Sequence, residues 1–401
     1  MLQDKKIVLG VTGSIAAYKA AELTREFVKR GAAVRVIMTG NAAEFITPLT
    51  FQTLSSNVVH SEMYPAINDY NLAHISLAEY ADIMVIAPAT ANIIGKIAAG
   101  FADDLLTTTV MTTRAPVLIC PAMNTNMYEN DIVQENIMQL TSRGYLFMEP
   151  GYGKLACRSE GQGRLPEVSD IVEEVESVLT VKDLGDERIL VTAGPTREHL
   201  DPVRYITNYS SGKMGYALAI AGRRRGARVV LISGPSALTA PRGVTFVSVS
   251  SAVEMEEAVM AHLKASTIVI KAAAVADYRP ANRLASKMKK QTGPLTLSLE
   301  RNPDIIAEIG KKKGKRILVG FAVETENLIE NARAKLVDKN MDLIVANDVT
   351  QAGAGFGYDT NIIKILDRNG GQVELPMMDK IAAADRILDR VKDIIAEKGR
   401  K

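Results

Sequence analysis

The sequence contains no tryptophan, and aromatic residues make up only 5% of its 401 positions. Any core must therefore be built mainly from alanine, valine, isoleucine, leucine and methionine. No apolar stretch approaches the roughly 18 residues of a membrane-spanning helix, and the apolar run near the N-terminus is too short for a signal peptide. The sequence therefore predicts a cytoplasmic protein with no membrane partner.

Cysteine is almost as scarce. Cys120 and Cys157 are the only two, and neither belongs to a C-x-x-C pair, so nothing suggests a disulfide framework or a zinc site. The chain also lacks a large excess of charge of either sign. Its formal net charge is +2, which is too small for a general nucleic-acid binder. The hydrophobic content of 47% is typical of a globular chain, and the length suits two cores.

The first part of the chain alternates short apolar runs with longer amphipathic segments. The expected strands are 6–11, 33–38, 82–87, 115–120 and 145–148. The expected helices are 15–30, 91–100, 103–113, 130–143 and 167–180. Buried strands that alternate with helices predict a parallel, doubly wound sheet. The glycine-rich segment 150–166 breaks this rhythm and is expected to be a flap or long loop.

A charged stretch, Lys182–Glu187, is the expected linker between a domain of residues 1–186 and one of residues 187–401. After it the alternation starts again with a strand at ERILVTAGPT. The further expected strands are 228–232, 244–248, 267–271, 316–321 and 342–346, with helices at 213–225, 252–264, 303–312 and 325–339. A β-hairpin around DRNGG and a helix at 379–397 complete the chain. The predicted fold class is α/β, with two doubly wound, Rossmann- or flavodoxin-like, three-layer domains in tandem.

A glycine-bearing turn opens each predicted domain. In the first, Gly10–Ala16 leads from a strand into a helix, where exposed N–H groups attract phosphate. Its spacing is not that of the dinucleotide fingerprint, so the phosphate of FMN fits as well as a dinucleotide, and a turn without ligand is the alternative. In the second, Ser210–Gly215 resembles a P-loop but lacks the required glycine at 207 and the Ser or Thr at 214. It is therefore another kind of phosphate-contacting loop or a helix cap.

Three residues of the first domain are candidates for catalysis: His74, Asn124 and Cys157. Each alone has a plain structural explanation, as a surface or packing histidine, a turn asparagine or a small buried thiol. Together they offer more, because a histidine exchanges protons or holds a carboxylate, and an asparagine fixes a carboxylate or amide. A cysteine on a glycine-hinged loop can deliver a proton to a closed site.

The motifs GVTGSIAAYK, LAHISLAEYAD, APATAN, PAMNTNMY and GKLACRSEGQGRLPE, in this order over residues 10–167, resemble the flavin-containing cysteine decarboxylases. More narrowly, they resemble phosphopantothenoylcysteine decarboxylase, although Tyr128 stands where many relatives have tryptophan. The resemblance implies non-covalent FMN that oxidises the cysteine moiety at its thiol, loss of carbon dioxide, return of the electrons and protonation by Cys157. It assigns substrate positioning to His74 and Asn124. The implied FMN contacts are Gly13, Ser14, Thr39, Thr90 and Asn92.

In the second domain, Asp277 follows the expected strand 267–271, and Lys287 begins the basic run KMKK. Such runs are usually solvated surface, but they can also bind nucleic acid or a nucleoside triphosphate. Without interleaved aromatic residues the nucleic-acid reading is set aside. A lysine in a loop near an aspartate favours a triphosphate, because lysine neutralises phosphate and aspartate can hold Mg²⁺ together with phosphate oxygens.

The motifs TAGPTREHLDPVRYITNYSSGKMG, KAAAVADYRP, KMKK, NPDII and GFAVET resemble phosphopantothenate–cysteine ligase over about 188–350, and the tandem fusion resembles the bacterial bifunctional proteins of coenzyme A synthesis. The resemblance implies phosphopantothenate, cysteine and CTP as substrates, with Mg²⁺ near Asp277. It assigns the acyl cytidylate intermediate to Asn208 and charge stabilisation to Lys287. The implied CTP contacts are Lys271, Ala272, Ala273, Asp277, Lys287, Pro303, Asp304, Ile305, Ile306, Phe321, Lys335 and Lys339.

The family further implies homo-oligomers, with trimers of the first domain assembled further and dimers of the second. Two other functions stay open at this point. One is a flavoprotein decarboxylase whose second half serves only in assembly, and the other is a nucleotide-binding module without catalysis.

Overall fold

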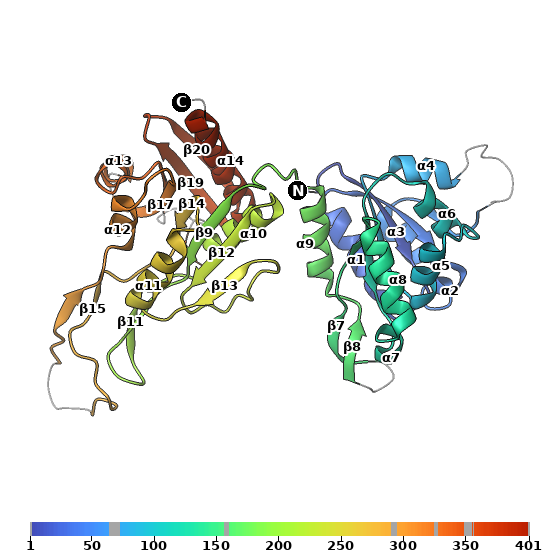
Figure 1. Ribbon diagram of the computed structural model, residues 1–401, viewed down its shortest axis with the longest axis horizontal. Coiled ribbons are helices and arrows are strands. Elements are labelled where there is room, and N and C mark those ends of the chain that lie inside the picture. The colour runs from blue at the N-terminus through green and yellow to red at the C-terminus, as the bar shows by residue number, and fades with distance from the viewer. Residues whose placement is uncertain are drawn as a thin grey trace. The chain divides into compact units, whose positions relative to one another are not determined.

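The computed structural model describes residues 2–63, 73–155, 160–289, 295–324, 328–348, 355 and 357–399. The chain forms two compact units, Met1–Thr180 and Val181–Lys401 (Figure 1). Each unit has its own sheet and its own cores, and each is described separately below.

The first unit is built on a six-stranded sheet in the order β3-β2-β1-β4-β5-β6. Its strands, which pair in parallel, are β1 (Lys6–Val11), β2 (Ala33–Met38), β3 (Val59–His60), β4 (Ile83–Ala89), β5 (Val117–Pro121) and β6 (Leu146–Phe147). This order is typical of doubly wound dinucleotide-binding folds, and its switch point lies between β1 and β4. The predicted doubly wound parallel sheet is confirmed.

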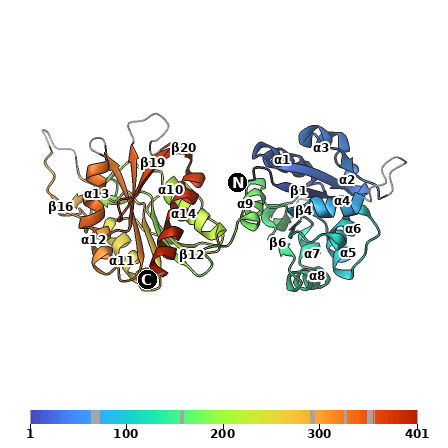
Figure 2. The same cartoon turned by 90° about the horizontal axis from the view of Figure 1, so that it is seen from above.

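Helices cover both faces of this sheet (Figure 2). They are α1 (Ala17–Lys29), α2 (Gly40–Ala43), α3 (Pro48–Ser55), α4 (Ala73–Tyr80), α5 (Ala91–Ala99), α6 (Leu105–Thr112), α7 (Thr125–Tyr128), α8 (Asp131–Ser142) and α9 (Val168–Leu179). Alternate side chains of β1 enter two cores. Ile7 and Leu9 pack with α1, α3 and α9, whereas Val8 packs with α4, α5, α6 and α8.

The segment predicted as a flap or loop contains a two-stranded antiparallel ribbon, β7 (Gly151–Lys154) and β8 (Glu160–Arg164). β8 lies against the loop that precedes α7, where Met123 N donates to Gly163 O at 2.9 Å. A Cβ on Gly163 would overlap Met123 O, and one on Gly161 would lie 2.5 Å from Thr125 Oγ1. The close approach of β8 to this loop requires glycine at both positions. Because glycine has no apolar side chain, the segment lacks the alternating pattern that would have predicted a strand.

The second unit repeats the same strand order and extends it. Its eight-stranded sheet runs β13-β12-β9-β14-β17-β18-β19-β20. The strands are β9 (Arg188–Ala193), β12 (Arg228–Ser233), β13 (Thr245–Ser248), β14 (Ile268–Lys271), β17 (Ile317–Glu324), β18 (Leu343–Asp348), β19 (Thr360–Asp367) and β20 (Gln372–Asp379). The last two form the predicted hairpin, which pairs antiparallel to β18 and completes the sheet. The switch point lies between β9 and β14.

Two helix layers flank this second sheet. One layer is α10 (Lys213–Arg224) and α14 (Lys380–Gly399), and the other is α11 (Ala252–Leu263), α12 (Ile305–Lys311) and α13 (Leu328–Asp338). Two small ribbons lie outside the sheet, β10 (Arg197–His199) with β11 (Tyr205–Thr207), and β15 (Tyr278–Pro280) with β16 (Leu299–Arg301). The two three-layer units agree with the predicted fold class.

The expected linker packs on the second unit. Leu184 is 1% exposed within the core of α10 and α14, and its N–H donates to Arg225 O at 3.0 Å. Asp183 pairs with Arg225 at 2.8 Å, and Lys182 Nζ donates to Arg224 O at 2.7 Å. The boundary between the compact units therefore lies at Thr180–Val181.

Candidate functional site

The carboxyl ends of β1 and β4 are joined directly at the switch point of the first unit. Thr12 Oγ1 donates to Pro88 O at 2.8 Å and accepts from Thr90 N at 3.1 Å. Thr90 then caps α5 by accepting from Ile93 N at 3.4 Å. These bonds hold the glycine turn and the start of α5 side by side, where open α/β sheets bind ligands.

A cavity of about 380 Å³ lies at this edge and is called the Thr39 cavity. Four predicted FMN contacts line it: Gly13, Thr39, Thr90 and Asn92. Thr39 Oγ1 is buried and has no hydrogen-bond partner among the described residues. Because a buried hydroxyl without a partner is costly, this atom is suited to a ligand. A Cβ on Gly13 would lie 2.5 Å from Asn41 Cβ, so the narrow turn requires glycine.

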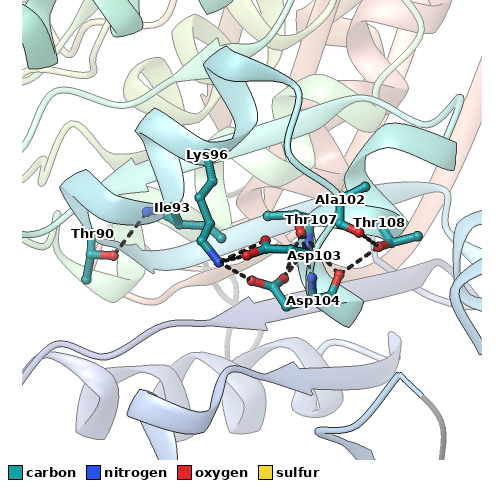
Figure 3. A network of polar contacts seen from close by, with 8 residues as sticks. All are labelled: Thr90, Ile93, Lys96, Ala102, Asp103, Asp104, Thr107 and Thr108. Carbon is teal, nitrogen blue, oxygen red and sulfur yellow. Dashed lines mark hydrogen bonds and ion pairs between the residues drawn. The ribbon is translucent and has the colours of Figure 1, made fainter.

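Lys96 and Asp104 also line the Thr39 cavity. Figure 3 shows these two side chains pointing toward each other from α5 and the start of α6. Lys96 Nζ lies 2.8 Å from Asp103 Oδ2 and 3.0 Å from Asp104 Oδ2, and these hydrogen bonds raise the pKa of Lys96. Burial opposes ionisation of Asp104, but hydrogen bonds from Thr107 and Lys96 keep its pKa below the ordinary value. Neither Lys96 nor Asp104 was among the candidates. Lys96 could have been found, because its i,i+4 spacing from the candidate Asn92 places these two residues on one face of α5.

A second cavity, of about 390 Å³, contains Asn124 and is called the Asn124 cavity. Asn124 caps α7 by accepting from Asn126 N at 2.9 Å. Ser14 lies in this cavity rather than among the residues that line the Thr39 cavity. The charged residues of the lining are all basic and come from three separate elements: Lys19, Lys154 and Arg164. This charge suits an anionic ligand, and it was not predicted because the three lysine and arginine positions are far apart in the sequence.

The other two candidates of the first unit are placed differently. His74 is the second residue of α4, is partly exposed and is not among the residues that line either cavity. Cys157 lies outside the described residues. The described strands on each side of it, β7 and β8, contribute Lys154, Gly163 and Arg164 to the lining of the Asn124 cavity.

Two neighbouring cavities lie at the carboxyl end of β14 in the second unit. The Lys339 cavity has a volume of about 480 Å³ and the Asn208 cavity about 460 Å³. They share Lys271, Val275, Asp277, Phe321 and Lys335. The predicted CTP contacts that line the Lys339 cavity are Lys271, Asp277, Pro303, Asp304, Ile305, Ile306, Phe321, Lys335 and Lys339. Ala272 and Ala273 line the Asn208 cavity.

Lys271, on the wall that the two cavities share, has a shifted pKa. Burial and the positive charge of Lys339 lower its pKa to about 8, against the attraction of Asp304 and Asp277. Lys271 Nζ donates to Ala273 O at 3.0 Å. Across the Lys339 cavity, Lys339 pairs with Asp304 at 2.9 Å. The wall therefore concentrates positive charge that phosphate oxygens can neutralise.

Asn208 follows β11 directly, and its Nδ2 donates to Val275 O at 3.1 Å. It lines the Asn208 cavity together with Lys213 and Lys380, which begin α10 and α14. Lys380 was not predicted, because only the folded chain brings the last helix to this edge of the sheet. Lys287 is exposed and is not among the residues that line either cavity.

Within the described residues, no group of three or more His, Cys, Asp or Glu side chains could hold a metal ion. Asp277 is a single carboxylate at the wall of both cavities. Such a carboxylate suits a Mg²⁺ ion whose other ligands are phosphate oxygens and water. Among the helices of the described chain, none is long and apolar enough to cross a membrane.

Two protein families match the two units. The flavoprotein family matches residues 1–180, and the DNA/pantothenate metabolism flavoprotein C-terminal domain matches residues 184–395. The coenzyme A biosynthesis bifunctional protein CoaBC of Bacillus subtilis is 49% identical, and the match covers 100% of both chains. The chain belongs to this bifunctional coenzyme A biosynthesis family.

The CoaBC protein of Escherichia coli is 46% identical, again over 100% of both chains. A crystal structure of the C-terminal domain of a CoaBC protein is 44% identical and covers 54% of this chain and 99% of that one, with a TM-score of 0.47. As a member of this family the chain is a bifunctional enzyme of coenzyme A biosynthesis. Its first unit is a decarboxylase and its second a phosphopantothenate–cysteine ligase. The units are called the decarboxylase unit and the ligase unit from here on.

Proposed function

We propose that the ligase unit joins 4′-phosphopantothenate to cysteine with CTP, and that the decarboxylase unit converts the product to 4′-phosphopantetheine with FMN. One observation carries the proposal. Lys271, Lys335, Lys339 and Asp277 surround a cavity that shares its wall with the cavity of Asn208. A triphosphate in the first and a carboxylic acid in the second would meet at that wall.

The Lys339 cavity suits the nucleotide. Lys271, Lys335 and Lys339 neutralise its phosphates, and Asp277 would hold the Mg²⁺ ion that offsets their charge. The carboxylate of phosphopantothenate attacks the α-phosphate from the Asn208 cavity and pyrophosphate leaves. The amine of cysteine then attacks the acyl cytidylate, and CMP leaves. Asn208 holds the intermediate, and Lys287 stabilises the charge that develops during activation.

The Thr39 cavity suits FMN. The hydroxyl of Thr39, which has no partner among the described residues, the narrow turn at Gly13 and the capped start of α5 all lie at the switch point. When bound, FMN supplies reversible two-electron chemistry at the thiol of the cysteine moiety, and this makes loss of carbon dioxide easy. Ser14 contributes from the adjoining Asn124 cavity.

The basic Asn124 cavity suits the anionic substrate of the decarboxylase unit. Lys19, Lys154 and Arg164 attract its phosphate and carboxylate groups, and Asn124 and His74 position the cysteine moiety. Cys157 supplies the final proton from the segment between β7 and β8. We place the enzyme in the cytoplasm, where it works as a homo-oligomer of decarboxylase trimers and ligase dimers.

Incubation of the protein with phosphopantothenate, cysteine and CTP, followed by mass spectrometry, tests the whole proposal. We expect pyrophosphate, CMP, the cysteine adduct and then its decarboxylated product. A coloured flavoprotein that releases no pyrophosphate would instead support a ligase unit used only for assembly. A colourless protein that takes up no FMN and forms no product would support a nucleotide-binding module.

Replacement of Thr39 by valine tests the flavin site. The change removes a buried hydroxyl that has no hydrogen-bond partner in the described part of the chain, so the free energy of unfolding of the ligand-free protein should not fall. FMN affinity should fall about tenfold through loss of one hydrogen bond. Flavin fluorescence titration measures the affinity, and Thr53→Val, on the exposed side of α3, is the control. Unchanged affinity would remove Thr39 from the flavin site.

The pH dependence of nucleotide affinity tests Lys271. Its pKa of about 8 means that the free protein loses this charge as the pH rises through that value. The triphosphate binds the charged form, so its dissociation constant should rise about tenfold from roughly pH 7 to pH 9. Binding at about pH 9 should also take up a proton, which calorimetry in buffers of different ionisation enthalpy detects. Lys271→Arg should flatten the profile, because arginine stays charged. An identical profile in that variant contradicts the assignment.

A further inference from the structure

Asp201 is a fully buried carboxylate in the turn that joins β10 to β11. Its Oδ1 accepts from the N–H groups of Val203 and Arg204, both at 2.8 Å. Its Oδ2 accepts from Arg204 Nε at 2.9 Å and Arg204 Nη2 at 2.7 Å. Burial opposes its ionisation, but hydrogen bonds from Met288, Val203 and Arg204 hold the pKa of Asp201 below its ordinary value. The two oxygens thus have separate tasks.

The second oxygen also reaches a distant segment. Met288 N donates to Asp201 Oδ2 at 3.1 Å, and Arg204 Nη2 donates to Met288 O at 2.7 Å. Both backbone polar groups of Met288 are therefore bound by one ion pair. Leu284 N adds a third bond to the same turn by donating to Leu200 O at 2.9 Å. The residue before Met288 is Lys287, whose own side chain is exposed.

The same turn leads to the other catalytic candidate of the ligase unit. β10 and β11 pair from Arg197 with Thr207 to His199 with Tyr205, and Asn208 follows at once. β11 and β15 lie in the two extensions that leave the second unit on the same side (Figure 1), and β10 is in contact with β15. One small ribbon therefore connects Asn208, which donates to Val275 O, with the backbone beside Lys287.

We propose that Asp201 is a positioning residue for ligation, which holds the backbone of Lys287 in fixed register with Asn208 through the contacts of its Oδ2 atom with Arg204 and Met288. The proposal rests on the proposed function of Lys287. Asp201 touches no substrate and acts only through this backbone. An exposed lysine on a loop without such an anchor would lose much of its effect, because charge stabilisation depends on preorganised geometry.

Asp201→Asn separates the two tasks of the carboxylate. The amide oxygen can keep the bonds from Val203 N and Arg204 N, so the turn is retained. The amide nitrogen then faces Met288 N and the Arg204 guanidinium, and a donor cannot accept from them. The variant should therefore fold but release Met288. Arg204→Lys is the second variant, because it keeps the charge and loses the forked contact.

We expect Asp201→Asn to raise the amide exchange rate of Met288 at least tenfold in the full-length protein. The kcat of pyrophosphate release should fall about tenfold, with the KM for CTP within about twofold of the unchanged protein. Glu257→Gln, an exposed carboxylate on α11, should change none of these quantities. Faster exchange with unchanged kcat would reduce Asp201 to a structural role and overturn the proposal.

A double-mutant cycle with Lys287→Ala decides whether the effect passes through Lys287. If it does, the double variant should be no slower than Lys287→Ala alone. Factors that multiply would show that Asp201 acts elsewhere and would overturn the proposal. An unchanged rate in Lys287→Ala would overturn it as well, by removing the role of Lys287. Failure of the proposed ligase chemistry is distinct, because the unchanged protein would then release no pyrophosphate.

Discussion

Gly163→Ala should lower the rate of decarboxylation by about a hundredfold or more while pyrophosphate release by the ligase unit stays unchanged. Gly163 has φ +146°, a conformation that side chains other than glycine rarely adopt. An added Cβ would also overlap Met123 O. β8 must therefore move away from Met123, the residue that directly precedes Asn124. Supplying phosphopantothenoylcysteine directly and measuring carbon dioxide tests this result without the ligase step.

Gly144→Ala is the matched control for backbone strain. Gly144 also has a left-handed conformation, with φ +92°, but a Cβ there meets nothing within 4 Å. It should lower the free energy of unfolding by about 1–2 kcal/mol and leave the decarboxylation rate within about twofold. Equal losses of rate in both variants would mean that the unit is merely destabilised. A fully active Gly163→Ala would contradict the seating of β8 on the Asn124 loop.

Asn208→Asp should lower the ligation rate by about a hundredfold and spare decarboxylation of supplied substrate. The aspartate cannot donate to Val275 O, and its charge repels both that carbonyl and the anionic acyl cytidylate. Rapid-quench analysis of CTP turnover should show whether the intermediate accumulates or is lost. Asn282→Asp adds the same charge to an exposed position outside both cavities and should leave the rate unchanged. Equal activity of the two variants would end the assignment of Asn208.

The strands of both sheets could be predicted because parallel strands buried on two faces are continuous apolar runs. Their order then follows from the doubly wound rule, and this places Thr39, Thr90 and Lys271 at strand ends. The switch point explains why residues as distant as Thr12 and Thr90 come together. Local patterns therefore account for most of the fold and for the positions of Thr39, Thr90 and Lys271 in the Thr39 and Lys339 cavities.

Other parts of the site depend on contacts that no local pattern contains. β8 forms where Gly161 and Gly163 permit close approach to the loop of Met123. These glycines leave the sequence of β8 without the alternating apolar residues that would predict a strand. Lys380 reaches the Asn208 cavity only because the final helix packs beside α10. Lys287 is recognisable by its charge, whereas its anchor depends on Asp201, far away in the sequence. Such pairings are set by the folded chain.

The burial of Leu184 in the second unit has a consequence for modularity. Lys182 and Leu184 are already attached to the ligase unit, and α9 packs on the decarboxylase core up to Leu179. Only Thr180 and Val181 lie between these attachments. Each core cluster is built from residues of a single unit, so a cut there would leave all members of every core on one fragment. Fission into two separate enzymes, or fusion from them, would therefore keep each core together.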